Sequence, residues 1–139
     1  LAVAADDSRF ATSGINVGLF CSTPSVPVSR NLGRKQAMEL LLTGHFIDAH
    51  TALQWGLVNR VVPASRLDQE VAELAGSIMS KSWVAVATGK RMFYKQLELP
   101  LESAYDYASG VMAGNMMADD VEEGVDAFMQ KRTPVWKHQ

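Results

Sequence analysis

Cys21 carries the most reactive type of side chain in this sequence, and it is the single cysteine among 139 residues. A thiolate at this position would be a nucleophile. No histidine or lysine stands near it in the sequence to favour the thiolate, so we expect a small buried apolar side chain and keep the nucleophile as the alternative. One thiol excludes an internal disulfide, and it is compatible with a reducing compartment.

The histidines and the first acidic residues lack the pattern of a catalytic or metal site. His45, His50 and His138 have no metal-ligand spacing and do not combine with a serine and an aspartate in a nucleophile motif. We expect all three on the surface or in loops, and we expect no metal. Asp6 and Asp7 follow a short apolar run, so they are expected in a solvated polar turn.

Composition and charge are those of an ordinary globular domain. Hydrophobic residues make up 47% and charged residues 20% of the sequence, which argues against disorder and against a fibrous repeat. The 13 basic and 15 acidic residues are interspersed and give a net charge of −2, so nucleic acid is not an expected partner. The apolar runs are far shorter than the roughly 20 residues of a membrane-spanning helix. We expect a soluble protein with one core.

The start of the chain predicts two short strands and a loop. Residues 1–5 form an apolar run with no methionine or cap ahead of it, as if the chain began inside a strand. A polar turn follows, and residues 9–12 are expected to be extended. Because two strands are marginal by themselves, we expect an upstream segment to complete the sheet. Glycines and prolines punctuate residues 13–29, which predicts a loop with at most one helical turn.

The middle of the chain predicts helices with definable ends. Residues 34–43 place four apolar side chains on one face, namely Ala37, Met38, Leu41 and Leu42. Gly44 suits the left-handed residue that ends a helix, and Asp48 can cap a short helix over residues 49–55. Residues 57–63 are expected to be extended.

Further helices are predicted over the second half. Ser65 with Asp68 resembles a capping box, and the apolar residues behind it recur at helical spacing: Leu67, Val71, Leu74 and Ile78. Residues 83–97 and 101–118 are expected to form two more helices.

A last helix is expected to open with Asp120 and Glu123 as a second capping box, and its predicted apolar stripe is Val121, Val125, Phe128 and Met129. Four methionines cluster in this part of the chain: Met112, Met116, Met117 and Met129. We expect them to fill the core, and a fatty-acyl or oligomer surface is the alternative.

Two stretches resemble the crotonase, or enoyl-CoA hydratase/isomerase, superfamily. Residues 33–63 are similar to the family's run G-x-x-x-A-x-E-x-x-x-T-G … A-x-x-A-x-x-x-G-L-V-x-x-V-x-P, and residues 122–136 are similar to its closing E-G-x-x-A-F-x-x-K-R-x-P-x-W/F element. The resemblance implies an α/β crotonase-type fold, of which the chain holds only the end of the spiral β core and a mostly α C-terminal region. Residues 1–63 would be the end of that core with the active-site loop, and residues 64–139 a helical oligomerisation region.

The resemblance also implies where the catalytic groups of the family lie. Members polarise an acyl-CoA thioester in an oxyanion hole of two backbone N–H groups, and hydratases add a pair of carboxylates. Both N–H donors and the first carboxylate would precede Leu1, and the second, the acid, falls on Gly14, which cannot transfer a proton. The loop beside the acyl pocket corresponds to Val17, Leu19, Phe20, Cys21 and Ser22. Residues 16–24 resemble one subgroup, enoyl-CoA hydratase domain-containing protein 3 and its relatives, which shares this glycine.

For CoA itself the resemblance points to Phe128 and Lys131. The family's final helix brings an aromatic and a basic residue at this spacing to the adenine and phosphates of CoA. The alternative places Phe128 in the core and Lys131 in solvent. No cofactor is expected beyond coenzyme A as part of the substrate. Family members pack as trimers or pairs of trimers through their C-terminal helices, so a homotrimer or hexamer is expected.

Two functional hypotheses stay open. In the first, the complete protein is an acyl-CoA enzyme of the hydratase/isomerase type in fatty-acid metabolism, with its N-terminal half in the same or another chain. Gly14 then argues against efficient hydration and leaves isomerisation, decarboxylation and thioester hydrolysis. In the second, the protein is a non-catalytic CoA-ester binder or an oligomerisation scaffold. The 139 residues by themselves are expected to be inactive, and the compartment would be the bacterial cytoplasm or the mitochondrial matrix.

Overall fold

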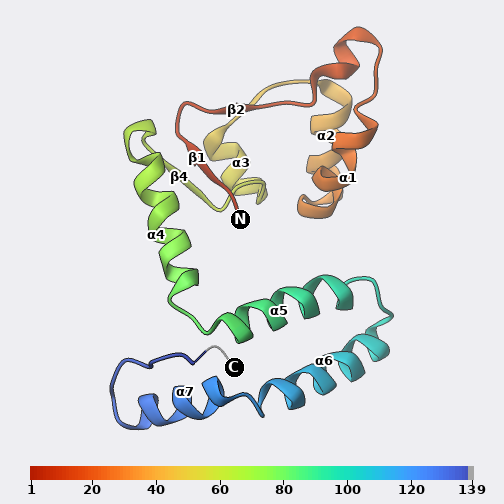
Figure 1. Ribbon diagram of the computed structural model, residues 1–139. Coiled ribbons are helices and arrows are strands. Elements are labelled where there is room, and N and C mark those ends of the chain that lie inside the picture. Colours follow the sequence, from red (N-terminus) through yellow and green to blue (C-terminus); the bar gives the residue numbers. More distant parts are fainter. Residues whose placement is uncertain (138–139) are drawn as a thin grey trace. The chain divides into compact units, whose positions relative to one another are not determined.

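The computed structural model describes residues 1–137, which form two compact units, Leu1–Glu73 and the part from Leu74 onward. Helices predominate in both units, and the strands are short and lie in the first (Figure 1). The predicted division at residues 63 and 64 stays a prediction. Among the described residues, none of the helices combines the length and apolar character that crossing a membrane would require.

Four short strands form two separate pairs in the first unit: β1 (Val3–Ala5), β2 (Arg9–Phe10), β3 (Ile47–Asp48) and β4 (Arg60–Val62). β1 pairs with β4 in parallel, with Ala4 opposite Val61, and β2 pairs with β3 antiparallel, with Phe10 opposite Ile47. The strand predicted at the start of the chain, the polar turn after it and the extended segment near residue 60 are all confirmed.

The loop predicted over residues 13–29 is wrong for most of its length. A 3-10 turn, η1 (Ser13–Val17), is followed by a full helix, α1 (Ser22–Asn31). Pro24 lies in the first turn of α1, where backbone N–H groups have no partner within the helix, so its missing donor costs nothing. Pro27 lies inside the helix and removes one interior donor. Near the end of the helix, the Asn31 side-chain amide donates to the Pro27 carbonyl at 2.8 Å. Prolines therefore punctuate this sequence without breaking the helix.

The two helices of the middle segment are confirmed with their ends: α2 (Arg34–Thr43) and α3 (Ala49–Trp55). Gly44 ends α2 with a φ of +64°, a left-handed backbone that favours glycine. At the start of α3 the Asp48 carboxylate accepts a hydrogen bond from the backbone N–H of Thr51 at 2.7 Å. The same N–H lowers the pKa of Asp48 below its ordinary value, because it stabilises the charged form.

The buried face of α2 differs from the predicted one. Ala37, Leu40 and Leu41 are 2–3% exposed, whereas the predicted Met38 and Leu42 are 50% and 52% exposed. Leu40 takes the inner position, because the face is rotated slightly from the one the apolar pattern indicates. The exposed pair leaves an apolar surface on the outer side of the helix.

The core of the first unit consists of two adjoining clusters of small buried side chains. One contains Ala4, Ala49, Ala52 and Val58, and the other contains Leu32, Ala37 and Leu40. Ile47 and Leu57 pack against both clusters. These two side chains therefore connect the core at the strands and α3 with the core at α2.

The capping box predicted at Ser65 is absent. Ser65 lies inside a 3-10 turn, η2 (Ala64–Arg66), whose N-cap is Pro63, and the helix α4 (Leu67–Met79) continues directly from that turn. Backbone N–H groups at the start of α4 donate to carbonyls of the 3-10 turn, as the Leu67 N–H does to Ala64, so no side-chain cap is present there. The predicted apolar stripe of α4 is at most half-buried: Leu67, Val71, Leu74 and Ile78.

The second unit contains three further helices: α5 (Trp83–Gln96), α6 (Leu101–Asn115) and α7 (Asp119–Met129). α5 and α6 form a helical hairpin (Figure 1). The Ser82 hydroxyl caps α5 by accepting from the Ala85 N–H at 3.2 Å, a cap that the sequence analysis missed. α6 ends three residues before the predicted Ala118, because the chain turns there to enter α7.

The capping box predicted at the start of α7 is also wrong. Ala118 is the N-cap, and Asp120 and Glu123 instead bind the chain that returns along the helix after its end. The predicted stripe is mostly exposed, since Val125, Phe128 and Met129 are 55%, 82% and 74% exposed. Ala127 is the buried apolar residue of α7, and Val121 is half-buried.

Candidate functional site

The segment between β2 and α1 is fastened to α2 at two points. The Thr12 hydroxyl, which is buried, donates to the backbone carbonyl of Leu40 at 2.7 Å. Farther along, the Asn16 side-chain amide donates to the carbonyl of Gly44 at 3.4 Å. These bonds join residues 28 positions apart and define where the loop lies on α2.

Gly14 lies at the centre of this segment, in a space that no side chain fits. The Leu19 N–H donates to the Gly14 carbonyl at 3.0 Å, which folds the chain back over the glycine. A Cβ atom at position 14 would lie 2.7 Å from the Leu19 carbonyl oxygen and 2.8 Å from the Cys21 Sγ. Carbon atoms do not approach oxygen or sulfur so closely, so the Leu19 backbone and the Cys21 side chain would have to shift. The predicted acid position is therefore occupied by a glycine that the loop itself requires.

The five residues predicted to border an acyl pocket differ in exposure. Val17 and Leu19 are 83% and 66% exposed, and Phe20 is 39% exposed. Cys21 is half-buried, with its Sγ over Gly14, and Ser22 is the exposed first residue of α1. Residues 12–22 contain no carboxylate, imidazole or ammonium group. The segment can offer an apolar surface, backbone groups, hydroxyls, one amide and one thiol, but no carboxylic acid, imidazole or amine for proton transfer.

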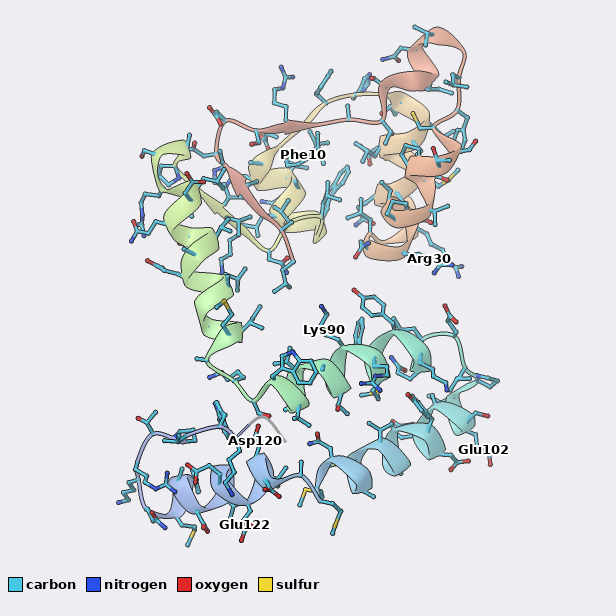
Figure 2. All side chains as sticks on the ribbon, viewed as in Figure 1. Phe10, Arg30, Lys90, Glu102, Asp120 and Glu122 are labelled. Atoms are coloured by element: carbon cyan, nitrogen blue, oxygen red, sulfur yellow. The ribbon has the colours of Figure 1, made fainter. Side chains whose placement is uncertain are left out.

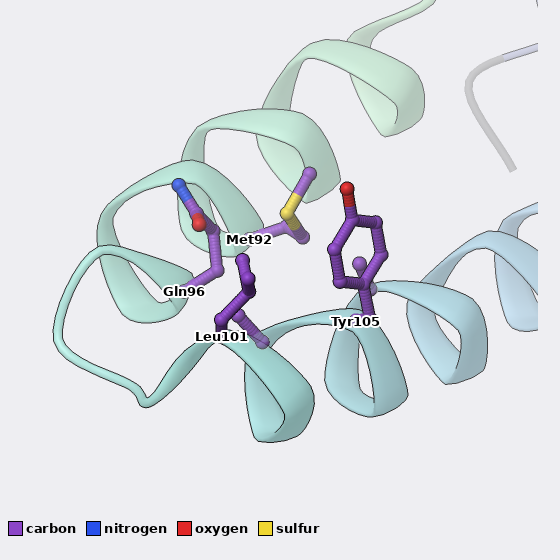
Figure 3. A pocket seen from close by; sticks show the side chains of 6 residues that line it. Met92, Gln96, Leu101 and Tyr105 are labelled. Atoms are coloured by element: carbon purple, nitrogen blue, oxygen red, sulfur yellow. The ribbon is translucent and has the colours of Figure 1, made fainter.

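Two grooves in the second unit were not predicted from the sequence: one lies between α5 and α6, and the other lies between the end of α4 and the start of α5. One groove of about 270 Å³ between α5 and α6 is lined by Met92, Gln96, Leu101, Ala104, Tyr105 and Ala108 (Figure 3). A second, of about 490 Å³, is lined by Ile78, Met79, Lys81, Trp83 and Val86. The signal for both was the run of large apolar residues that stay exposed, such as Tyr105 and Met79.

The end of α7 presents the residues predicted for CoA. Phe128 is 82% exposed, so the structure does not place its ring in a core, which was the alternative prediction. Lys131 is exposed and has a φ of +53°, and among the residues described it is the non-glycine residue with a positive φ. Around it the Lys131 N–H donates to the Phe128 carbonyl at 3.2 Å and the Arg132 N–H to the Ala127 carbonyl at 3.0 Å. This pair of bonds is the Schellman ending of a helix, in which glycine is usual at the position of Lys131.

Glu123 binds the chain just after that ending. Its carboxylate accepts from both guanidinium NH₂ groups of Arg132, at 2.6 and 2.8 Å, and from the Val135 N–H at 2.7 Å. The hydrogen bond from Arg132 is the main reason why the pKa of Glu123 falls from 4.5 to about 2, and the Val135 N–H adds to it. From the sequence, Glu123 is predicted to form a capping box with Asp120, and both Glu123 and Arg132 belong to the family's closing element, so their pairing was not predicted.

Two more contacts hold the C-terminal segment. The Lys137 N–H donates to the Asp120 carboxylate at 2.6 Å, and the Trp136 indole N–H donates to the Ser80 carbonyl at 2.8 Å. Asp120 lies on the side of α7 that faces this segment, and Glu122 points away from it (Figure 2). Residues 132–137 are thus bound along the helix.

Of the remaining candidates, those within the described residues are exposed. His45 lies in the connection after α2 and His50 on the surface of α3, and His138 lies outside the described residues. Asp6 and Asp7 are exposed in the turn after β1, as predicted.

The family model for enoyl-CoA hydratase/isomerase matches residues 1–139. The chain belongs to the enoyl-CoA hydratase/isomerase family. It is 51% identical over 138 residues to the mitochondrial enoyl-CoA hydratase domain-containing protein 3 of Rattus norvegicus, with 99% of this chain and 46% of the relative covered. It is also 34% identical over 140 residues to a carnitinyl-CoA dehydratase of Citrobacter koseri, covering 97% of this chain and 54% of that protein. The resemblance to the domain-containing protein 3 subgroup is confirmed.

Solved structures of the enoyl-CoA hydratase/isomerase family confirm the fold. The crystal structure of an enoyl-CoA hydratase from Mycobacterium smegmatis matches with a TM-score of 0.94 and 55% sequence identity. The match covers 98% of this chain and 53% of that structure. The chain spans about half the length of the curated relatives it matches. It therefore has the architecture of the mostly α C-terminal portion of the crotonase-type fold.

Proposed function

We propose that the protein binds a CoA thioester through the end of α7 and acts on it in fatty-acid metabolism. The observation that carries the proposal is the pairing of an exposed aromatic ring, Phe128, with a cation, Lys131, that is kept at a backbone position usual for glycine. The nucleotide end of CoA offers an adenine ring and several phosphates. An exposed ring stacks on a base, and an ammonium attracts phosphates.

Hydration of a double bond is not the activity we propose for it. Water addition to an enoyl-CoA needs one carboxylate to take a proton from water and a second acid to deliver a proton to the α-carbon. The position that the family resemblance assigns to that acid is Gly14, and the Leu19 carbonyl and the Cys21 thiol occupy the space around it. The proposed reaction is therefore one that dispenses with this acid, namely isomerisation, decarboxylation or thioester hydrolysis.

The crowding around Gly14 also supports a second candidate function. The space at Gly14 is filled by other atoms of the loop, so the loop has no opening for a side chain there. This supports a non-catalytic CoA-ester binder or oligomerisation scaffold. The two candidates share the CoA site and differ in turnover.

A paired experiment on the complete gene product that contains residues 1–139 tests both. Binding of crotonyl-CoA is measured by calorimetry and its hydration by loss of the conjugated thioester absorbance. We expect binding without efficient hydration, and we expect Lys131→Ala to weaken binding. Hydration as fast as that of a two-carboxylate hydratase would overturn the exclusion of hydratase activity. Absence of any CoA-ester binding would overturn the proposal as a whole.

The assembly and setting proposed for the protein follow from the family. We propose a homotrimer or hexamer that packs through the C-terminal helices, with the N-terminal half of the fold in the same or another chain. Exposed apolar side chains on α6 and after it support this: Tyr105, Met112, Met116 and Met117. The proposed compartment is the mitochondrial matrix or the bacterial cytoplasm, and no cofactor besides the substrate's CoA is proposed. Light scattering of the complete protein measures the assembly.

A further inference from the structure

The backbone at Lys131 is held in a conformation that its own side chain disfavours. A left-handed φ is costly for any residue with a Cβ atom, and such residues persist only where the surroundings impose the conformation. Before Lys131, the Gln130 N–H donates to the Asp126 carbonyl at 2.9 Å and completes the last turn of α7. Together with the two Schellman bonds at Lys131 and Arg132, this bond orders the backbone as far as the Arg132 N–H. The direction of the chain beyond Arg132 depends on other contacts.

Glu123 supplies those contacts. Its carboxylate holds the Arg132 guanidinium by two hydrogen bonds and the Val135 N–H by a third. Arg132 follows Lys131 directly, and Val135 lies four residues beyond it. Glu123 is itself on the second turn of α7, and its side chain is 16% exposed, so the three bonds are shielded in part from water. The Glu123 carboxylate thus binds the chain at two places after the turn, at Arg132 and at Val135.

We propose that Glu123 is a positioning residue that holds Lys131 in its left-handed conformation and thereby presents Lys131 with Phe128 as one preformed site for the phosphates and adenine of CoA. This inference rests on the proposed function of the end of α7. Without the anchor, only the Schellman hydrogen bonds oppose the strain at Lys131. Its backbone then adopts right-handed and extended conformations more often, and the ammonium samples more positions. Binding must then order the turn, and the cost of ordering reduces affinity.

A double-mutant cycle in the complete gene product tests this role, with coenzyme A as the titrant. We expect Lys131→Ala to weaken CoA binding by roughly fivefold, the scale of one exposed ionic contact. Glu123→Gln, which keeps the shape but removes the charge, is expected to weaken it by a similar factor. In the Lys131→Ala background, Glu123→Gln should have no further effect, because its influence passes through Lys131.

Glu122→Gln is the matched control, because Glu122 is exposed on the same helix and points away from the returning chain (Figure 2). It should leave CoA affinity unchanged. If Glu123→Gln lowers the melting temperature so far that binding cannot be measured, Arg132→Lys replaces it, since a lysine keeps the charge but cannot make the paired contact. We expect the same dependence on Lys131 for that variant.

The outcomes separate this inference from the function on which it rests. Loss of affinity in Lys131→Ala but none in Glu123→Gln would overturn the positioning role and leave the CoA site intact. An equal loss from Glu123→Gln with and without Lys131 would also overturn it, because the effect would then be general destabilisation. Unchanged affinity in Lys131→Ala would overturn the CoA site itself.

Discussion

The thiol of Cys21 lies over Gly14, with its Sγ 2.8 Å from the point where a side chain on that glycine would begin. The Leu19 carbonyl oxygen lies 2.7 Å from the same point. Because this oxygen belongs to the backbone, it cannot move away without distorting the chain. At the position that the family resemblance assigns to the acid, the glycine therefore does more than leave out a carboxylate. The loop around it has a conformation that depends on the absence of a side chain.

Gly14→Ala should destabilise the protein. The new methyl group forces the Leu19 carbonyl or the Cys21 side chain to move, and overpacking of this kind costs about 1–3 kcal/mol of unfolding free energy. Chemical denaturation measures the change. Gly76→Ala is the control: position 76 is inside α4 with nothing within 4 Å of an added Cβ, so it should stabilise by roughly 0.5–1 kcal/mol. Equal stability of Gly14→Ala and the native protein would show that the loop adapts at no cost.

Gly14→Glu should not create a hydratase. The carboxylate needs the space that Leu19 and Cys21 occupy, so the variant is expected to hydrate crotonyl-CoA no faster than the native protein and to be less stable. The rate and the melting temperature are measured on the same preparations. A clear rise in hydration would show that only the acid was lacking and would contradict the steric argument.

Thr12→Val should weaken the attachment of the loop to α2. Valine has the shape of threonine but cannot donate to the Leu40 carbonyl, which would remain buried without its 2.7 Å bond. Leaving a buried acceptor unpaired costs about 1–3 kcal/mol, to be measured by denaturant unfolding. Thr23→Val, at an exposed position on α1, is the control and should change stability by less than about 0.5 kcal/mol. Similar losses in both variants would remove the special role of Thr12.

Glu123 should contribute stability that depends on pH. Its pKa is depressed from 4.5 to about 2, so the folded state prefers the carboxylate, and the contribution is complete above pH 4.5. The contribution decreases as the pH falls from 4.5 toward 2, because the unfolded state takes up a proton near pH 4.5 and the folded state only near pH 2. Unfolding free energies of the native protein and Glu123→Gln should therefore converge over this interval. A difference that is independent of pH would contradict the assignment.

Lys131→Gly should separate stability from binding. Glycine adopts the left-handed conformation without strain, so the unfolding free energy is expected to rise by about 1 kcal/mol, while CoA affinity falls as the ammonium is lost. Lys131→Ala removes the same charge but keeps the strain, and it serves as the comparison for both measurements. Lower stability in the glycine variant than in the alanine variant would show that the backbone at position 131 is not strained.

The sequence by itself determined the features that depend on neighbouring residues. Gly44 and Asp48 mark the end of one helix and the start of the next, because left-handed backbone and a capping carboxylate act within one turn. The motif around residues 33–63 likewise identified the family, which the comparisons confirm. The sequence also predicts helix caps at Ser65 and Asp120, and both predictions are wrong. Ser65 lies inside a 3-10 turn, and Asp120 lies within α7 after its N-cap.

Only the tertiary structure decided what surrounds Gly14 and what Glu123 binds. The contacts of Cys21 and Leu19 with the glycine follow from a turn whose path is set by α2, which begins twenty residues later. Glu123 binds the returning chain and does not cap α7, because Arg132 and the Val135 N–H lie within hydrogen-bond distance of its carboxylate. A hydrogen bond or a steric contact depends on the distance between two residues in space. The periodicity of a sequence predicts such distances only between residues of the same helix or strand.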